Sequence, residues 1–193
     1  MVHRMISDFF HPNVGGVENH IYMLSSQLLR RGHKVSYFKD VLYSIFSNRA
    51  TFKVIVITHS HPPDRVGVRW LLPGLKVYHI PFKIVASSAT LPNFFTFLPY
   101  YRTILLRERI NLIHAHASLS SLGHEGILHA HHLGVRTVFT DHSLFGFEDA
   151  ASILTNKLLA ATLAHVDSVI CVSHTRYRFT SFRYTVDFRS NIA

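Results

Sequence analysis

Short apolar runs rich in β-branched residues alternate along this chain with stretches whose apolar residues recur at helical spacing, and this alternation constrains the fold most. Strands that alternate with helices of this length form right-handed βαβ units around a parallel sheet. We therefore expect an α/β fold, a Rossmann-like parallel sheet flanked by helices. Strands are predicted over residues 2–7, 53–58, 75–80, 112–116, 136–140 and 168–172, and helices over 17–32, 119–133 and 153–161.

The composition is that of one globular domain. The 193 residues, 48% of them hydrophobic, are enough to bury one ordinary core. A single cysteine, Cys171, excludes an intramolecular disulfide and favours a reducing compartment. Residues 1–10 are too polar for a secretory signal, and no run reaches the roughly 18 apolar residues of a membrane span. We expect a soluble chain or one that is peripheral to a membrane.

The net charge of +9 favours an anionic partner such as a phospholipid headgroup, a phosphorylated ligand or a nucleic acid. A third of this excess lies in residues 176–193, which hold four arginines and one aspartate. Aromatic residues alternate with these arginines, a pattern that is also found where rings stack on bases. We rank nucleic-acid binding low, because its support is confined to this tail.

Two adjacent glycines, Gly15 and Gly16, open the first predicted helix directly after a strand. Glycines at such a position let a phosphate or a sugar approach free backbone N–H groups at the positive end of the helix. The loop lacks the third glycine of a dinucleotide fingerprint and the Lys-Ser/Thr of a P-loop, so spacing alone favours a plain tight turn equally. Glu18 in the first turn either complements the helix dipole or binds a hydroxyl-rich ligand.

Sixteen histidines raise the question of a metal site. His114 and His116 share one face of a predicted strand, and a second group lies on the following predicted helix at His129, His131 and His132. Neither a cysteine nor a carboxylate stands at ligand spacing beside them. We therefore predict no metal site.

His142 lies just beyond the carboxyl end of a predicted strand, which is where open α/β sheets bind ligands. The letters Asp141-His142-Ser143 do not make a hydrolase triad, because triads assemble from separated positions. Residues 91–102 concentrate aromatic side chains beside a cation, and such a segment either lies in a membrane interface or packs as core. The two interpretations of this segment are equally supported.

Four segments of the chain resemble a known family. They are SDFFHPNVGGVE at residues 7–18, RGHKV at 31–35, TVFTDHSLFGF at 137–147 and LTNKLL at 154–159. These segments are similar to the catalytic subunits of phosphatidylinositol N-acetylglucosaminyltransferases. The third segment is highly specific, whereas the glycine loop alone is typical of the wider group of retaining glycosyltransferases with two Rossmann-like lobes, the GT-B fold. The resemblance extends over nearly all of residues 2–175.

The resemblance implies the amino-terminal, acceptor-binding lobe of a GT-B glycosyltransferase. The implied reaction is transfer of N-acetylglucosamine from UDP-N-acetylglucosamine to phosphatidylinositol, the first step of glycosylphosphatidylinositol (GPI) anchor synthesis. It implies no cofactor besides this donor substrate. It also implies a multi-subunit complex on the cytoplasmic face of the endoplasmic reticulum membrane, with phosphatidylinositol, other subunits and the membrane surface as partners, and no nucleic acid.

Carried onto this sequence, the resemblance assigns roles to four residues. Gly15 and Gly16 would line the cleft near the donor phosphates, Glu18 would lie on the acceptor side, and His142 would be the catalytic residue that faces the reacting sugar. The physical properties of the loop agree, because a helix dipole and backbone N–H groups can stabilise a departing diphosphate without a metal.

The chain departs from the family at two segments. Residues 36–52 form an atypical insertion within the expected lobe of residues 1–175, and residues 176–193 form a divergent basic and aromatic tail that we expect to be poorly ordered. The family continues into a second, nucleotide-binding lobe, so we expect this polypeptide to be inactive alone. The alternative is a non-catalytic lobe that binds a lipid or a protein partner.

Overall fold

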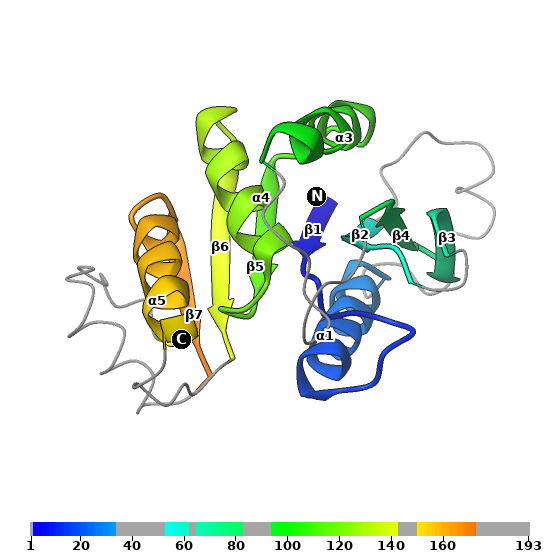
Figure 1. The fold of residues 1–193 in the computed structure, drawn as a ribbon. Coiled ribbons are helices and arrows are strands. Elements are labelled where there is room, and N and C mark those ends of the chain that lie inside the picture. Colours follow the sequence, from blue (N-terminus) through cyan, green and yellow to red (C-terminus); the bar gives the residue numbers. More distant parts are fainter. Residues whose placement is uncertain (1, 34–52, 62–64, 83–93, 143–149, 173–193) are drawn as a thin grey trace.

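The computed structural model describes residues 2–33, 53–61, 65–82, 94–142 and 150–172 (Figure 1). Its strands form one seven-stranded sheet in the order β3-β4-β2-β1-β5-β6-β7. The strands are β1 (Val2–Ile6), β2 (Lys53–His59), β3 (Gly67–Leu72), β4 (Leu75–Ile80), β5 (Leu112–His116), β6 (Arg136–Asp141) and β7 (Ser168–Cys171). The helices are α1 (Gly16–His33), α3 (Phe94–Arg107), α4 (Ser121–His132) and α5 (Ala150–Leu163).

The predicted α/β fold with a Rossmann-like parallel sheet is confirmed, and one antiparallel edge strand, β3, is added to it. All pairings are parallel except that of β3 with β4, which is antiparallel. No sequence pattern indicated β3, because its side chains are exposed or half-buried and it lacks the apolar run of a buried strand. A tight turn with Gly74 at φ 89° joins β3 to β4, which makes β3 an antiparallel edge strand.

The strand order places a switch point between β1 and β5. From β1 the chain builds β2, β4 and β3 on one side, and it then returns to build β5, β6 and β7 on the other side. The loops that leave β1 and β5 therefore lead to helices in opposite directions. A crevice opens at the carboxyl ends of the strands where such a reversal occurs, and ligands bind there in sheets of this type.

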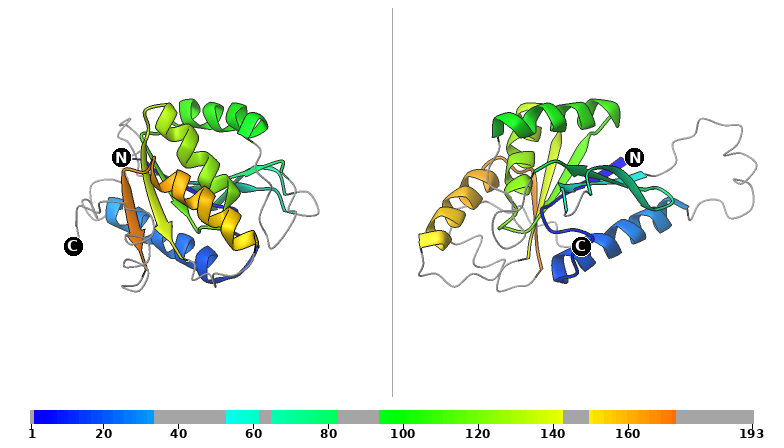
Figure 2. Two further views of the ribbon diagram at one scale, coloured as in Figure 1. Left: turned by 60° about the vertical axis from the view of Figure 1, so that its left-hand side comes forward. Right: turned by 45° about the vertical axis from the view of Figure 1, so that its right-hand side comes forward.

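Helices cover both faces of the sheet (Figure 2). Successive residues of β1 and β2 alternate between two cores, so that Met5 packs with α1 on one face, whereas Ile6 packs with the other three helices on the opposite face. The core beneath α1 also contains Val54, Val56, Leu75, Val77, Ile21 and Leu29. The larger core contains Ile55, Ile57, Ile113, Phe139, Phe97, Tyr101, Ile127, Leu159 and Leu163, among others.

Local sequence signals determine where α4 begins and ends and how closely it packs on the sheet. The Ser120 side chain caps its amino end and accepts a hydrogen bond from Gly123 N at 3.0 Å. Gly134, at φ 69°, follows its carboxyl end, a conformation that costs glycine little. Within the helix, a Cβ on Gly126 would lie 2.6 Å from Cδ1 of Ile6, so α4 packs on β1 more closely than any other residue type would permit.

The aromatic segment forms α3 and contributes to the core. Phe97 and Tyr101 are fully buried and stack with their ring centroids 5.0 Å apart, and Tyr101 Oη donates to Gly126 O at 2.9 Å. Phe95 and Tyr100 are exposed instead. The core interpretation of the segment thus holds for Phe97 and Tyr101, whereas a membrane interface stays a prediction for the exposed rings. The side chain of Phe94 lies outside the described residues. Across the described residues, no helix combines the length and apolar character needed to cross a membrane.

Two segments singled out in the sequence lie outside the described residues. They are the atypical insertion at 36–52 and the basic tail at 176–193. The division of the chain into a lobe over 1–175 and a separate tail therefore remains a prediction. The described chain leaves α1 at His33 and re-enters the sheet at Lys53.

Candidate functional site

The four residues assigned from the sequence lie near the switch point, at the carboxyl ends of the strands. Gly15 and Gly16 are at the start of α1, which follows the loop from β1, and Glu18 is in the first turn of that helix. His142 directly follows β6 at the same edge of the sheet. The structure thus brings together residues that are more than 120 positions apart in the sequence.

Two further histidines meet His142 at this edge, namely His20 from α1 and His116 from the end of β5. Nδ1 of His116 lies 3.2 Å from Nε2 of His142. The ring of His20 is centred 4.7 Å from that of His142 and 5.7 Å from that of His116. We call His20, His116 and His142 the histidine trio.

The trio is surrounded by groups that hold its rings neutral. Burial, followed by repulsion from His20, lowers the pKa of His142 to about 4, although Asp141 acts in the opposite direction. Burial lowers the pKa of His116 well below its usual value, and neighbouring histidines add to this shift. Burial also lowers the pKa of His20. At neutral pH these rings therefore offer lone pairs and N–H groups to a ligand rather than positive charge.

A second layer of contacts supports His116. The ring of His114 stacks on it at 4.2 Å between centroids, and Nε2 of His114 pairs with Oγ1 of Thr140 at 2.7 Å. The next residue, Ala117, has φ 69°, a left-handed conformation that costs a non-glycine residue roughly 1–2 kcal/mol. Ala117 N donates to Thr140 O at 3.1 Å, which helps to hold this turn. Such strain is often found next to binding sites.

Gly15 and Gly16 differ in what surrounds them. A Cβ on Gly15 would collide with the carboxylate of Glu18, whereas a Cβ on Gly16 would meet nothing within 4 Å. Glu18 is buried, with its carboxylate folded against the glycine loop. Gly15 therefore makes room for Glu18, while Gly16 leaves open space in front of the first turn of α1. This arrangement fits both interpretations of Glu18, as a dipole partner and as a ligand contact.

The glycine loop is tied to the amino end of α4 by Asp8, which lies in the first segment of the resemblance but was assigned no role from the sequence. The carboxylate of Asp8 accepts hydrogen bonds from Ser120 Oγ at 3.0 Å and from Leu122 N at 3.1 Å. Its own N–H donates to Ser120 Oγ at 2.9 Å. Asp8 thus anchors the β1–α1 loop to the amino end of α4.

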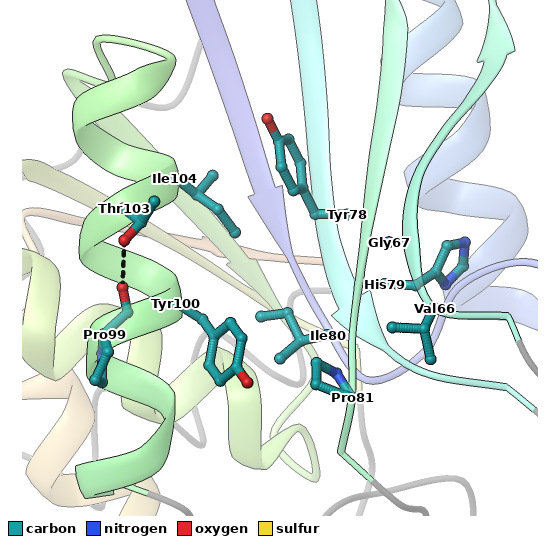
Figure 3. A pocket seen from close by; sticks show the side chains of 10 residues that line it. All are labelled: Val66, Gly67, Tyr78, His79, Ile80, Pro81, Pro99, Tyr100, Thr103 and Ile104. Atoms are coloured by element: carbon teal, nitrogen blue, oxygen red, sulfur yellow. Dashed lines mark hydrogen bonds between the residues drawn. The ribbon is translucent and has the colours of Figure 1, made fainter.

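An apolar groove lies between α3 and the pair β3–β4 (Figure 3). Its volume is about 510 Å³. In Figure 3 Tyr100 projects from α3 toward Ile80 and Pro81 at the end of β4. The groove is lined by Val66, Gly67, Tyr78, His79, Ile80, Pro81, Pro99, Tyr100, Thr103 and Ile104. On the same helix as Tyr100, the side chain of Phe95 is 94% exposed.

The other histidines considered in the sequence do not join the trio. His131 and His132, at the carboxyl end of α4, lie near His165, with ring centroids 5.0 Å and 6.2 Å away. His129 packs near Phe97 and Tyr101. His116 is therefore partnered by residues from α1 and the end of β6, which sequence spacing on one strand or helix cannot reveal.

Comparisons with known proteins agree with these features. The family model PIGA (GPI anchor biosynthesis) matches residues 59–149. Over 89% of its length the chain is 51% identical to the phosphatidylinositol N-acetylglucosaminyltransferase gpi3 subunit of Schizosaccharomyces pombe. Over 93% it is 45% identical to a human phosphatidylinositol N-acetylglucosaminyltransferase subunit. It covers 33% of each of these relatives, so it spans about a third of their length.

Among solved structures, a sucrose-phosphate synthase from Thermosynechococcus elongatus superposes with a TM-score of 0.60 at 14% identity, over 95% of this chain and 45% of that one. This likeness confirms the expected fold, a Rossmann-like lobe of the GT-B type. The sequence matches to the transferase subunits confirm the resemblance seen in the four segments. The chain is therefore similar to the PIGA (GPI anchor biosynthesis) family model over residues 59–149, and to these transferase subunits over most of its own length.

Proposed function

We propose that the protein to which this chain belongs transfers N-acetylglucosamine from UDP-N-acetylglucosamine to phosphatidylinositol, the first step of GPI-anchor synthesis. The observation that carries the proposal is the meeting of the amino end of α1 with His142 at the switch point, where the ring of His20 lies 4.7 Å from that of His142. The names of the relatives, which are subunits of such transferases, support the same reaction.

The donor fits the properties of this site. The first N–H groups of a helix have no acceptor within the helix and form the positive end of its dipole, so they can stabilise the diphosphate that leaves with UDP. The open space at Gly16 gives a phosphate access to them. Neutral His142 accepts or donates one hydrogen bond to a sugar hydroxyl at the reacting centre. In this proposal no cofactor besides the donor substrate is needed.

Glu18 has a different role in this proposal. A carboxylate at the amino end of α1 would repel a diphosphate, and it is a good acceptor for the hydroxyl groups of an inositol ring. Since Glu18 is buried against Gly15, it is held on one side of the open space at Gly16. We assign it to the acceptor side, with the phosphates on the side of Gly16.

The lipid part of the acceptor fits the apolar groove. Its walls are aliphatic and aromatic side chains, and Phe95 and Tyr100 are exposed on α3 together with Arg102. An exposed aromatic and basic helix is typical of surfaces that lie on anionic membranes. We propose that this side of the lobe contacts the cytoplasmic face of the endoplasmic reticulum membrane. Because the relatives are named as subunits, we also propose further subunits as partners.

A lobe that binds a lipid or a partner without catalysis is the second candidate. It is favoured by one observation, namely that the apolar groove between α3 and the pair β3–β4 has a lining that does not include His142. The two functions differ in their dependence on His142, since only the transferase uses that ring at the reacting sugar. Nucleic-acid binding through residues 176–193 ranks low on the sequence, and those residues lie outside the described ones.

A hybrid protein tests the proposed reaction. This chain would replace the region that it matches in the gpi3 subunit of Schizosaccharomyces pombe, and membranes carrying the hybrid would be assayed for transfer from UDP-N-acetylglucosamine to phosphatidylinositol. We expect transfer well above that of membranes that lack gpi3. A hybrid that accumulates to the normal level but transfers nothing would contradict the proposal and favour the binding lobe.

Vesicle binding tests the membrane surface separately. The chain should bind vesicles that contain phosphatidylinositol more strongly than neutral ones, and salt should weaken the binding. Replacing Phe95 and Tyr100 by serine should reduce binding several-fold. The matched control is Ile170→Ser, which removes an exposed apolar side chain from β7 at the opposite edge of the sheet. Equal losses in both variants would argue against a membrane surface on α3.

A further inference from the structure

We infer that His116 is a positioning residue, which holds Nε2 of His142 and thereby keeps the proton of the His142 ring on Nδ1. Nδ1 of His116 lies 3.2 Å from Nε2 of His142, where the neighbouring strands β5 and β6 end. The hydrogen bond made by one nitrogen of a histidine decides whether the other nitrogen carries the proton. The inference rests on the proposed function, since it specifies which atom of His142 meets the reacting sugar.

Each of the two rings carries a single N–H. Burial lowers the pKa of His116 well below its usual value and that of His142 to about 4, so both rings are neutral at neutral pH. A neutral imidazole has one nitrogen that donates and one that accepts. The contact between the rings therefore has two possible directions, because either His116 donates from Nδ1 or His142 donates from Nε2.

The second nitrogen of His116 decides between these directions. Nε2 of His116 is buried and has no hydrogen-bond partner within the part of the chain that the structure describes. If His142 were the donor, the proton of His116 would lie on this nitrogen as a buried N–H without an acceptor. Folded proteins leave a buried N–H unpaired less often than they leave an acceptor unfilled. The favoured arrangement therefore leaves Nε2 of His116 without a proton and makes its Nδ1 the donor to His142.

His116 is held more firmly than His142. The side chain of His116 is fully buried, and the ring of His114 stacks on it at 4.2 Å between centroids. The residue after it is tied to β6, because Ala117 N donates to Thr140 O at 3.1 Å. His142 is half-buried, and among the described residues its ring is hydrogen-bonded to His116 alone. A fixed ring thus orients a ring that is open to a ligand.

The arrangement determines what His142 offers to a ligand. With Nε2 engaged by His116, the free polar group of the His142 ring is the N–H of Nδ1. An N–H donates to a sugar hydroxyl oxygen or to an oxygen that gains negative charge during transfer, and it cannot take up a proton. The inference therefore makes His142 a hydrogen-bond donor in the proposed transfer and not a general base.

NMR of the unchanged chain tests the inference without a transfer assay. With ¹⁵N-labelled histidine at pH 7, couplings between ring C–H groups and nitrogens distinguish a ring protonated on Nδ1 from one protonated on Nε2. The signals would be assigned by their loss in His142→Gln and His116→Asn, and we expect Nδ1–H in both rings. His124 is the internal reference for the opposite form, because its Nε2 lies 2.8 Å from Ser118 O, which only accepts. A His142 ring protonated on Nε2, or a mixture of both forms, would overturn the inference.

Two substitutions of similar shape separate positioning from packing. His116→Asn places an amide N–H close to the position of Nδ1, whereas His116→Leu has nearly the same shape and no donor. In the hybrid protein, kcat and kcat/KM should fall together about tenfold in His116→Leu, and most of the rate should return in His116→Asn. Equal rates in the two variants, whether lowered or not, would overturn the positioning role. A hybrid that transfers nothing in any form would instead contradict the proposed function, and the NMR result would still decide the inference about the two rings.

Discussion

His61 offers a sharp test of how burial shapes the stability of this chain. The side chain is 2% exposed, and its ring centroid lies 4.3 Å from that of His59 and 5.8 Å from that of His79. Desolvation, followed by repulsion from His59, His79 and Arg65, lowers the pKa of His61 to about 4. Its Nε2 has no hydrogen-bond partner among the described residues. We therefore expect protonation of His61 to oppose folding.

The magnitude follows from the pKa of His61 in the two states. In the unfolded chain His61 takes up a proton near pH 6.5, whereas in the folded chain it stays neutral down to about pH 4. The unfolding free energy therefore falls as the pH drops below 6.5, by about 1.4 kcal/mol per pH unit, and levels off below about pH 4. Between pH 7 and pH 4, His61 alone should remove about 3 kcal/mol of stability.

Replacing His61 by phenylalanine removes this titration and keeps a buried ring. Unfolding in urea, followed by circular dichroism at pH 7 and pH 4, should show that the variant loses about 3 kcal/mol less stability than the unchanged chain. The control is Gly134→Ala. Alanine is strained at the positive φ of residue 134, so this variant should lose about 1 kcal/mol of stability. The loss should be the same at both pH values, because no titrating group is changed. If the unchanged chain and His61→Phe lose the same stability between pH 7 and pH 4, burial does not hold His61 neutral.

Three further perturbations have expected outcomes. Gly126→Ala should lower the unfolding free energy by about 1–3 kcal/mol, because the added Cβ would overlap Cδ1 of Ile6. Ile6→Val removes that Cδ1, so the double variant should recover part of the loss, and additive losses in chemical unfolding would contradict this contact. Asp8→Ala should lower the unfolding free energy by about 2–3 kcal/mol, since Ser120 Oγ and Leu122 N lose the carboxylate that accepts their hydrogen bonds. A loss below about 0.5 kcal/mol would argue that Asp8 does not anchor the β1–α1 loop to α4. Deleting residues 36–52 should leave the midpoint of thermal unfolding unchanged or raise it, because a segment added between α1 and β2 is not needed to cover either face of the sheet. Loss of a cooperative thermal transition would instead assign those residues to the core.

Sequence patterns predicted the buried strands well because those patterns are local. In β2, residues 54–57 are all apolar, so the side chains on both faces of the strand are apolar, as they must be where helices cover both faces of the sheet. Prediction failed for β3, an exposed edge strand without that pattern. It also failed for α3, which was not predicted as a helix because residues 94–101 are mostly aromatic and Pro99 stands inside the helix. Packing of Phe97 and Tyr101 on the sheet outweighs the weak local preference there.

The candidate site was only partly accessible from the sequence. Gly15, Gly16, Glu18 and His142 came from the resemblance and from their places at the ends of strands. Asp8 was missed because its partner Ser120 is 112 positions away in the sequence. The histidine trio was missed for the same reason, since three separate elements supply its members and no spacing rule connects them. Such groupings depend on strand order, which sequence periodicity does not determine.

The most direct measurement of the central claim is the transfer rate of the hybrid protein when His142 is replaced by alanine. If His142 faces the reacting sugar at the switch point, kcat for transfer to phosphatidylinositol should fall about 100-fold with little change in the amount of folded hybrid. His132→Ala, which changes an exposed histidine at the carboxyl end of α4, should transfer at the unchanged rate. A His142→Ala hybrid that keeps nearly full kcat would show that the reaction does not take place at this site.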